Sequence, residues 1–170
     1  SFTDGRSIPQ LGYGVWQVEN EVASDGDVSA LEAGYRHVDT ARGYNNEAGV
    51  GQALQLAGLP RDEVFVTSKV PNQDQGRDAP LRSFDASLAD LGPDALDLYL
   101  IHWPAPSKGL ALDTSKALAA PQAQGLIPPS GAPTFSLADL EQIEAETGVL
   151  PVLNQIEVHP YLANEELRAF

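Results

Sequence analysis

The 170-residue sequence has no cysteine and no methionine, and its ten lysine and arginine residues face 24 aspartate and glutamate residues. Without cysteine, disulfides, thiolate metal sites and a cysteine nucleophile are excluded. Because methionine is missing even at position 1, we expect that the initiator is absent from this sequence. The net charge of −14 disfavours binding to nucleic acid or to anionic membranes, since both rest on clustered basic side chains.

Long apolar runs are missing too. No run approaches the roughly 20 residues that span a bilayer, and no charged start followed by an apolar stretch predicts a signal peptide. We therefore expect a cytoplasmic protein that makes no membrane contact. With 42% hydrophobic and 20% charged residues, the chain is predicted to form one globular domain over residues 1–170 with a substantial core.

The chain alternates short β-prone runs with longer amphipathic ones, which is typical of repeated βα units. The predicted strands span residues 11–16, 35–40, 64–70, 96–102 and 152–158. They recur at intervals of roughly thirty residues, enough for one strand, one helix and two loops. A small hairpin is predicted at Asp4-Gly5, ahead of the first strand.

Between these runs, helices are predicted from apolar spacing and from capping residues. Ser136, followed three residues later by Asp139, marks a helix start of the capping-box type. About six βα units can be counted. A closed (β/α)8 barrel needs eight units and about 250 residues, so the sheet is either open or part of a larger barrel. One helical stripe is formed by Leu81, Phe84, Leu88 and Leu91.

Four polar residues occur at or just past the ends of predicted strands. They are Asp39 and Tyr44 in HVDTARGY, Lys69 in VFVTSKV, and His102 in LDLYLIHWP. In a barrel, the carboxyl ends of all strands share one face, where catalytic groups collect. An acid, a phenol, an ammonium and an imidazole at one place can transfer a proton to a carbonyl oxygen.

The residue types also predict how these groups interact. Lys69 lies in an apolar strand, so a carboxylate partner such as Asp39 is expected. A neighbouring lysine would lower the pKa of the Tyr44 phenol toward neutrality. His102 could donate a hydrogen bond to the same substrate oxygen or relay its proton. None of these groups supplies a hydride, which a nicotinamide would have to provide.

Structural explanations exist for each residue alone: a helix cap, a core aromatic, half of an ion pair, or a hydrogen-bonded core histidine. His37 and His159 are interpreted as structural residues. Combined with Glu47 and Glu157, they show no metal-ligand spacing, so no metal site is expected.

Four segments resemble the successive signatures of the aldo-keto reductase family: GYRHVDTARGYNNEAGVGQAL, FVTSK, LDLYLIHWP and LNQIEVHPYL. The resemblance runs from about residue 2 to residue 170 and is closest to bacterial members similar to 2,5-diketo-D-gluconate reductase. It implies an α/β fold, the (β/α)8 TIM barrel, of which about six units are present. It also implies NADPH-dependent reduction of an aldehyde, ketone or keto-sugar, and a monomer if the barrel is complete.

The resemblance further implies a role for each of the four polar residues. Tyr44 would be the general acid, Lys69 and Asp39 would tune it, and His102 would orient the carbonyl. The substrate pocket would be formed by Trp16, Tyr44, His102 and Trp103. The expected contacts to the cofactor are Val15, Trp16, Asp39, Thr134 and Gln155.

Departures from the family pattern concentrate near the fifth unit. The segment GAPTF replaces a GVSNF-like one, so Pro133 and Thr134 stand where a serine and an asparagine usually hold the carboxamide. Pro128 and Pro129 fall where a central strand is expected, and proline cannot donate to a ladder. Pro121 falls inside a predicted helix, where it would cost about 3 kcal/mol or cause a kink.

The sequence ends at Phe170, inside the expected sixth helix. By resemblance, the seventh and eighth units and the basic loop that grips the adenosine 2′-phosphate would lie outside it. No G-x-G-x-x-G or P-loop motif offers a substitute. These departures motivate an alternative hypothesis, a catalytically silent fragment or variant that uses the barrel for binding or assembly.

Overall fold

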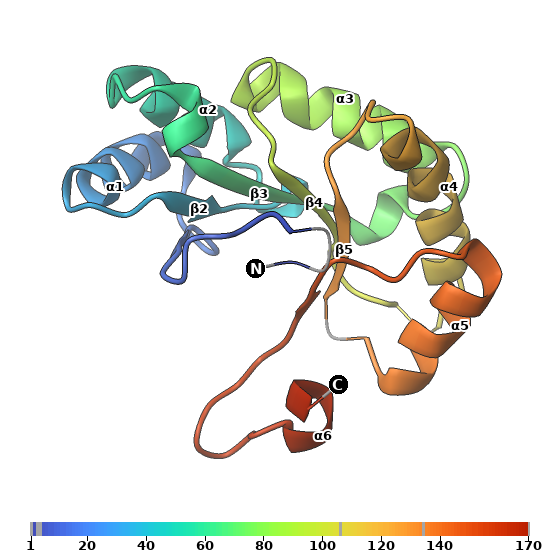
Figure 1. The fold of residues 1–170 in the computed structure, drawn as a ribbon. Helices are drawn as coiled ribbons and strands as arrows, with labels where there is room; N and C mark the ends of the chain where they lie inside the picture. The colour runs from blue at the N-terminus through green and yellow to red at the C-terminus, as the bar shows by residue number, and fades with distance from the viewer. Residues whose placement is uncertain (1, 3–4, 106, 134, 170) are drawn as a thin grey trace.

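The computed structural model describes residues 2, 5–105, 107–133 and 135–169 (Figure 1). Strands and helices alternate along the chain. The strands are β1 (Tyr13–Gly14), β2 (His37–Asp39), β3 (Phe65–Val70), β4 (Leu98–Ile101), β5 (Ser130–Pro133) and β6 (Asn154–Gln155). The α-helices are α1 (Asn20–Glu32), α2 (Glu47–Leu56), α3 (Ala79–Leu91), α4 (Ala111–Ala123), α5 (Leu137–Thr147) and α6 (Glu165–Ala169). The 3-10 helices are η1 (Arg42–Tyr44), η2 (Arg61–Glu63) and η3 (Asn72–Asp74).

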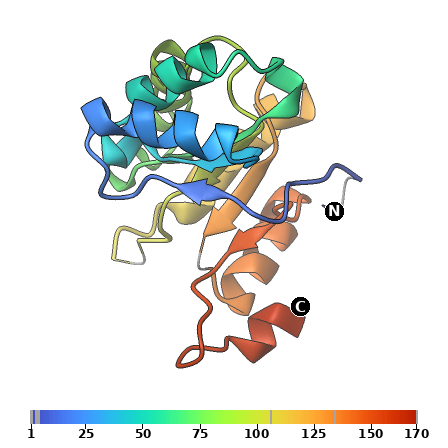
Figure 2. The ribbon, with the colours of Figure 1, turned by 90° about the vertical axis from the view of Figure 1, so that its left-hand side faces the viewer.

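The six strands form one parallel sheet in the order β1-β2-β3-β4-β5-β6. Each strand neighbours the next in sequence, as expected when every crossover carries one helix. The sheet curves, and helices α1 to α5 cover its outer side (Figure 1). Helix α6 lies near the first turn of α5, and residues of both helices line one pocket (Figure 2). The arrangement is an arc of a βα barrel, as the sequence predicts.

The main core lies between the strands and the outer helices. Phe84 and Leu91, on the predicted helical stripe, are buried in α3, while Leu81 and Leu88 pack at its margin. In α5, Leu140 is buried, and Ser136 and Asp139 form the predicted capping box. Strands and helices alike contribute further buried side chains, including Val38, Val66, Tyr99, Ile101, Leu31, Val50, Leu118 and Ile143.

Helix α2 packs unusually close to its neighbours because two glycines face them. A Cβ on Gly49 would lie 2.3 Å from the carbonyl oxygen of Asn20 in α1. A Cβ on Gly51 would lie 2.5 Å from the carbonyl oxygen of Asp90 in α3. Larger residues would push the helices apart, so these glycines allow α2 to pack closely against α1 and α3.

Prolines near the fifth unit are accommodated without breaking the fold. Pro128 and Pro129 precede β5, and the carbonyl of Pro129 still accepts a hydrogen bond from the Tyr99 N–H. The strand therefore begins where backbone donors become available again. Pro121 lies in the last turn of α4, near the helix end, where the loss of one hydrogen bond is least disruptive.

The predicted amino-terminal hairpin is only partly testable, because Asp4 lies outside the described residues. The Phe2 N–H donates to the carbonyl of Arg6 at 2.7 Å, and the Gly5 N–H donates to the carbonyl of Phe2 at 3.1 Å. Over residues 5–12, however, the backbone forms no strand. That described stretch therefore contains no hairpin ladder.

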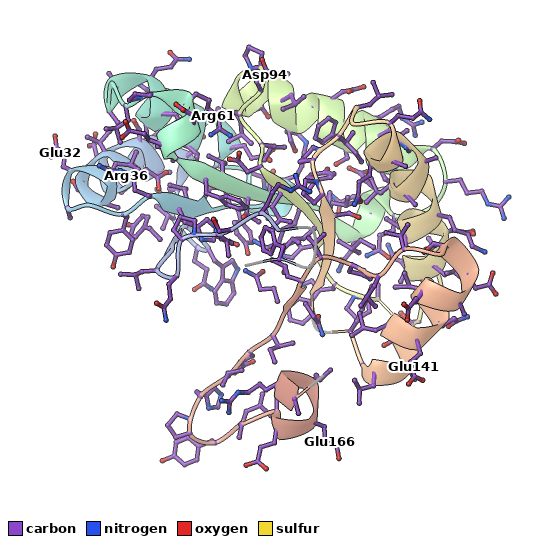
Figure 3. All side chains as sticks on the ribbon, viewed as in Figure 1. Glu32, Arg36, Arg61, Asp94, Glu141 and Glu166 are labelled. Atoms are coloured by element: carbon purple, nitrogen blue, oxygen red, sulfur yellow. The ribbon has the colours of Figure 1, made fainter. Side chains whose placement is uncertain are left out.

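Acidic side chains are spread over the outer surface. Glu32, Asp94, Glu141 and Glu166 belong to four different parts of the chain, and all are exposed (Figure 3). The net charge thus forms a solvated surface rather than one acidic site. Throughout the described part of the chain, no helix has the length and apolar character needed to cross a membrane.

Candidate active site

The four predicted residues lie together at the carboxyl end of the sheet. Asp39 ends β2, Lys69 is the penultimate residue of β3, and His102 directly follows β4. Tyr44 ends the 3-10 helix η1 after β2. The parallel register aligns these strand ends, so the fold itself delivers all four side chains to one region.

Lys69 and Asp39 form a buried ion pair. The Lys69 side chain is 3% exposed, and its ammonium donates to Oδ1 of Asp39 and, at 2.8 Å, to the carbonyl of Thr40. Burial lowers the pKa of Lys69, and the Asp39 carboxylate partly opposes this effect. Asp39 is thus the carboxylate partner that the sequence predicts, because an unpaired buried ammonium would be costly.

Tyr44 packs against both His102 and Lys69. The ring centroids of Tyr44 and His102 are 5.3 Å apart at 74°, and Lys69 Nζ lies 5.3 Å from the Tyr44 ring centroid. The predicted lowering of the phenol pKa is wrong for this structure. Burial, with the negative charge of Asp39, raises the pKa of Tyr44 to about 12. At neutral pH, the phenol is therefore fully protonated and able to donate.

His102 is neutral at physiological pH. Burial and the positive charge of Lys69 lower its pKa to about 4, while Asp39 opposes them. A neutral imidazole still carries one N–H that can hydrogen-bond to a carbonyl oxygen. The ring also stacks on Trp103, with centroids 6.4 Å apart at 24°.

Both tryptophans lie open to solvent, which removes the explanation that they are core residues. Trp16 is 67% exposed and Trp103 is 51% exposed. Trp103 is also held through its backbone carbonyl, which accepts from Nε2 of Gln75 at 2.5 Å. Exposed aromatic side chains near a few polar groups are typical of ligand-binding surfaces.

The expected cofactor contacts differ in their placement. Val15 is fully buried, and its N–H donates to the carbonyl of Asp39 at 3.1 Å, which continues the pairing of β1 with β2. Gln155, at the end of β6, donates from Nε2 to Oδ2 of Asp39 at 2.9 Å. Thr134 lies outside the described residues.

Sequence reasoning missed the buried residue Asn46. Its amide donates to the carbonyls of Val15 and Val18 at 2.8 and 2.9 Å, and its oxygen accepts from the Thr40 hydroxyl at 2.8 Å. Asn46 thereby ties the loop that carries Trp16 to the loop after β2. The polar NNE run at the start of an apolar helix is the signal that could have indicated it.

The remaining histidines have structural environments. Nε2 of His37 lies 3.0 Å from the Thr67 hydroxyl, and its ring packs edge-on against Phe65. His159 bonds to the exposed carboxylate of Glu157 at 2.8 Å. Across the described stretches, no three metal-ligating side chains come together.

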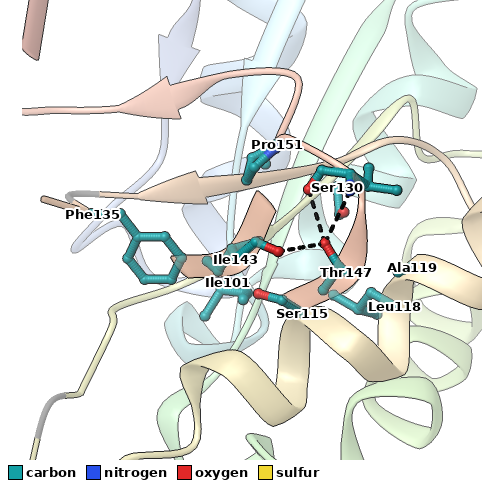
Figure 4. A pocket seen from close by; sticks show the side chains of 11 residues that line it. Ile101, Ser115, Leu118, Ala119, Ser130, Phe135, Ile143, Thr147 and Pro151 are labelled. Atoms are coloured by element: carbon teal, nitrogen blue, oxygen red, sulfur yellow. Dashed lines mark hydrogen bonds between the residues drawn. The ribbon is translucent and has the colours of Figure 1, made fainter. Parts of the chain in front are cut away.

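A small cavity between β5, α4 and α5 lies apart from these residues (Figure 4). Its lining includes Ile101, Leu118 and Phe135, and its volume of about 20 Å³ is enough for one water molecule. The Thr147 hydroxyl beside it donates to the carbonyl of Ile143 at 2.7 Å. The cavity is a gap in helix-to-sheet packing.

A sequence model of the Aldo/keto reductase family matches residues 10–170. The chain belongs to this family. An aldo-keto reductase of Mycolicibacterium smegmatis is 48% identical over 168 residues, which cover 99% of this chain and 61% of that protein. Methylglyoxal reductase DkgA of Salmonella typhimurium is 45% identical over 167 residues, covering 98% of this chain and 60% of that protein.

Two solved structures, one of them that of an aldo/keto reductase, have the same arrangement of strands and helices. The enzyme from Brucella melitensis superposes with a TM-score of 0.94 at 50% identity, covering 99% of this chain and 66% of its own. A Gox0644 mutant in complex with NADPH superposes with a TM-score of 0.93 at 42% identity, covering 100% of this chain and 61% of its own. The chain therefore spans about three fifths of the length of these aldo/keto reductases, and the resemblance seen in its motifs is confirmed.

Proposed function

We propose that this protein reduces a carbonyl group to an alcohol with NADPH, and that Tyr44 is the general acid. The observation that carries the proposal is the cluster at the carboxyl end of the sheet, where Tyr44 packs between the Lys69–Asp39 ion pair and His102. Membership in the aldo/keto reductase family supports it, as does the NADPH bound to the Gox0644 mutant.

Each residue has a defined task in this proposal. The carbonyl oxygen gains negative charge during reduction and becomes an alkoxide, a stronger base than a phenolate. Tyr44, protonated at neutral pH, transfers its phenolic proton to that oxygen. Lys69 then stabilises the phenolate electrostatically, while Asp39 keeps the lysine charged and in place. Neutral His102 donates a hydrogen bond that orients the carbonyl.

The residues at the strand ends suit a flat ring that carries a carboxamide. Trp16 and Trp103 present exposed aromatic faces, and Gln155 places an amide beside Asp39. We assign Val15, Trp16, Asp39, Thr134 and Gln155 to the cofactor side of the site. When bound, the nicotinamide supplies the hydride.

A small aldehyde or ketone is the substrate class that we propose, and methylglyoxal is the first compound to test. The reason is the 45% identity to the methylglyoxal reductase of Salmonella typhimurium. The alternative, a silent binding module, loses part of its motivation because Pro128 and Pro129 precede β5 without disrupting the sheet.

The test uses protein expressed from the complete natural coding sequence. NADPH oxidation with methylglyoxal is measured for the parent, for Tyr44→Phe and for Tyr161→Phe, a control at a site that is 97% exposed. Tyr44→Phe should lower kcat by about 10² to 10⁴-fold, while the Kd for NADPH, measured by tryptophan quenching, stays within about twofold. Equal turnover in both variants would refute the role of Tyr44. A parent that reduces none of a panel of aldehydes and ketones would refute the proposed function.

A further inference from the structure

Glu47 is a buried acid that lies outside the four proposed catalytic residues. Its side chain is 2% exposed at the first position of α2. One carboxylate oxygen accepts from the Ser68 hydroxyl at 2.6 Å, and the other accepts from the Arg42 guanidinium at 2.9 Å. Two partners and a helix amino terminus offset the cost of burying this charge.

These two contacts connect the elements that carry Tyr44 and Lys69. Ser68 is fully buried and directly precedes Lys69 in β3. Arg42 begins η1, the 3-10 helix that ends at Tyr44. The Glu47 carboxylate therefore holds the start of the tyrosine turn against the lysine strand.

The turn needs such support because it is short. Its backbone is closed by two hydrogen bonds, from Tyr44 N–H to the Ala41 carbonyl at 2.9 Å and from Asn45 N–H to the Arg42 carbonyl at 3.2 Å. Asn45 then reverses the chain at a φ of 57°. A single 3-10 turn has weak hydrogen-bond geometry, so its position depends on tertiary contacts.

We propose that Glu47 is a positioning residue for carbonyl reduction, one that fixes the Tyr44 phenol relative to Lys69 and His102. The inference rests on the proposed function, because it assigns Glu47 to the same site. Glu47 acts through the backbone of η1 and β3. A displacement of about 1 Å at the reacting groups can cost on the order of 10²-fold in rate, so the loss should appear in kcat.

A matched control exists on the outer side of the same network. The guanidinium of Arg42 also contacts Asp90 in α3, at 2.5 Å, and the Asp90 side chain is 43% exposed. Asp90→Asn removes the negative charge of the Asp90 carboxylate beside the Arg42 guanidinium. It leaves the hydrogen bonds from Ser68 and from Arg42 to Glu47 in place. It should therefore leave kcat within about twofold of the parent.

The experiment compares five variants of protein from the complete natural coding sequence: Glu47→Ala, Glu47→Gln, Ser68→Ala, the double variant of Glu47→Ala with Ser68→Ala, and Asp90→Asn. We expect Glu47→Ala to lower kcat by about 10 to 100-fold with little change in the Kd for NADPH. Glu47→Gln, which keeps an acceptor for Ser68, should retain more activity. The double variant of Glu47→Ala with Ser68→Ala should lose less than the product of the single losses, because both remove one contact. The proposal would be overturned if Glu47→Ala left kcat unchanged. It would also be overturned if the decrease in kcat of each variant matched the fraction of that variant that is unfolded.

Hydrogen exchange gives a readout that does not need turnover. Amides of residues 41–47 should exchange faster in Glu47→Ala than in Asp90→Asn, with α4 and α5 unchanged. If Glu47→Ala does not fold, Ser68→Ala serves for the same comparison. If the unsubstituted protein reduces no carbonyl compound, the proposed function is refuted. Hydrogen exchange over residues 41–47 would then still test whether Glu47 holds the Tyr44 turn in place. Equal exchange over 41–47 in all variants would refute the positioning role.

Discussion

The amide of Gln155 donates to the Asp39 carboxylate at 2.9 Å, although the two residues are 116 positions apart in the chain. Gln155 ends β6 and Asp39 ends β2, and three strands separate these two in the sheet. A hydrogen bond between side chains of these two strands requires a strongly curved sheet. The hydrogen bond therefore links sheet curvature to the ion pair at the site.

Removing this link should weaken the closure of the arc. Gln155→Ala is expected to lower the free energy of unfolding by about 1 kcal/mol, the typical net contribution of one hydrogen bond, because this bond is exposed to solvent. Urea denaturation is the measurement, and Gln73→Ala, at an exposed position of η3, is the control. Equal midpoints for both variants would mean that the bond adds nothing to stability.

The pH dependence of reduction follows from the shifted groups. Tyr44, with a pKa of about 12, stays protonated through the neutral range, and His102, with a pKa of about 4, stays neutral there. We therefore expect kcat/KM to form a plateau at neutral pH and to fall only as pH drops toward 4 or rises toward 12. A pH–rate profile checks this. An inflection near pH 7 that disappears in His102→Gln would contradict the assigned pKa of the imidazole.

Asp27 predicts a separate pH effect, on folding. It is fully buried in α1, and neither carboxylate oxygen has a hydrogen-bond partner among the residues that the structure describes. Burial raises its pKa from 3.8 to about 7. Between about pH 4 and 7, the unfolded chain has released this proton while the folded chain keeps it. Stability should therefore fall as pH rises through this window, by on the order of 4 kcal/mol in total.

Two variants in the same helix isolate this effect. Asp27→Asn removes the ionisation and should flatten the dependence of the unfolding free energy on pH between about 4 and 7. Asp25→Asn, at an exposed position of α1, should leave the slope as in the parent. Urea unfolding at several pH values is the measurement, and equal slopes in the two variants would contradict the assignment.

Asn46 should be among the polar residues most sensitive to substitution. Asn46→Ala removes the amide donor from the carbonyls of Val15 and Val18, of which Val15 keeps the Val18 N–H, and it removes the acceptor of the Thr40 hydroxyl. The expected loss is roughly 3 kcal/mol of unfolding free energy, because unsatisfied buried groups bear their full desolvation cost. The fluorescence of Trp16 should change too, since its loop loses both anchors.

The matched variant is Asn46→Asp, which keeps the acceptor for Thr40 but removes both donors. The new carboxylate oxygen would face two carbonyl oxygens in a buried site, so Asp at this position should be at least as destabilising as Ala. Thermal unfolding compares them. Stability close to the parent in both variants would show that the network is dispensable.

Local patterns predicted much of the fold because they report local physics. The apolar spacing of Phe84 and Leu91 predicted α3, and Ser136 with Asp139 predicted the start of α5. Predicted strand bounds were too long at both edges of the sheet, where β1 and β6 have two residues each. Ladder length depends on how neighbouring strands align, and local sequence does not encode that alignment.

The order and type of the residues determined which chemical groups reach the carboxyl end of the sheet: Asp39, Tyr44, Lys69 and His102 follow from the βα repeat. Only the tertiary structure decided their ionisation. Burial, with the negative charge of Asp39, raised the pKa of Tyr44 rather than lowering it. It also decided that Asn46 and Glu47, polar residues at the start of a helix, are buried and hold loops together. Desolvation and long-range contacts depend on what surrounds a side chain in space, which sequence neighbours alone do not specify.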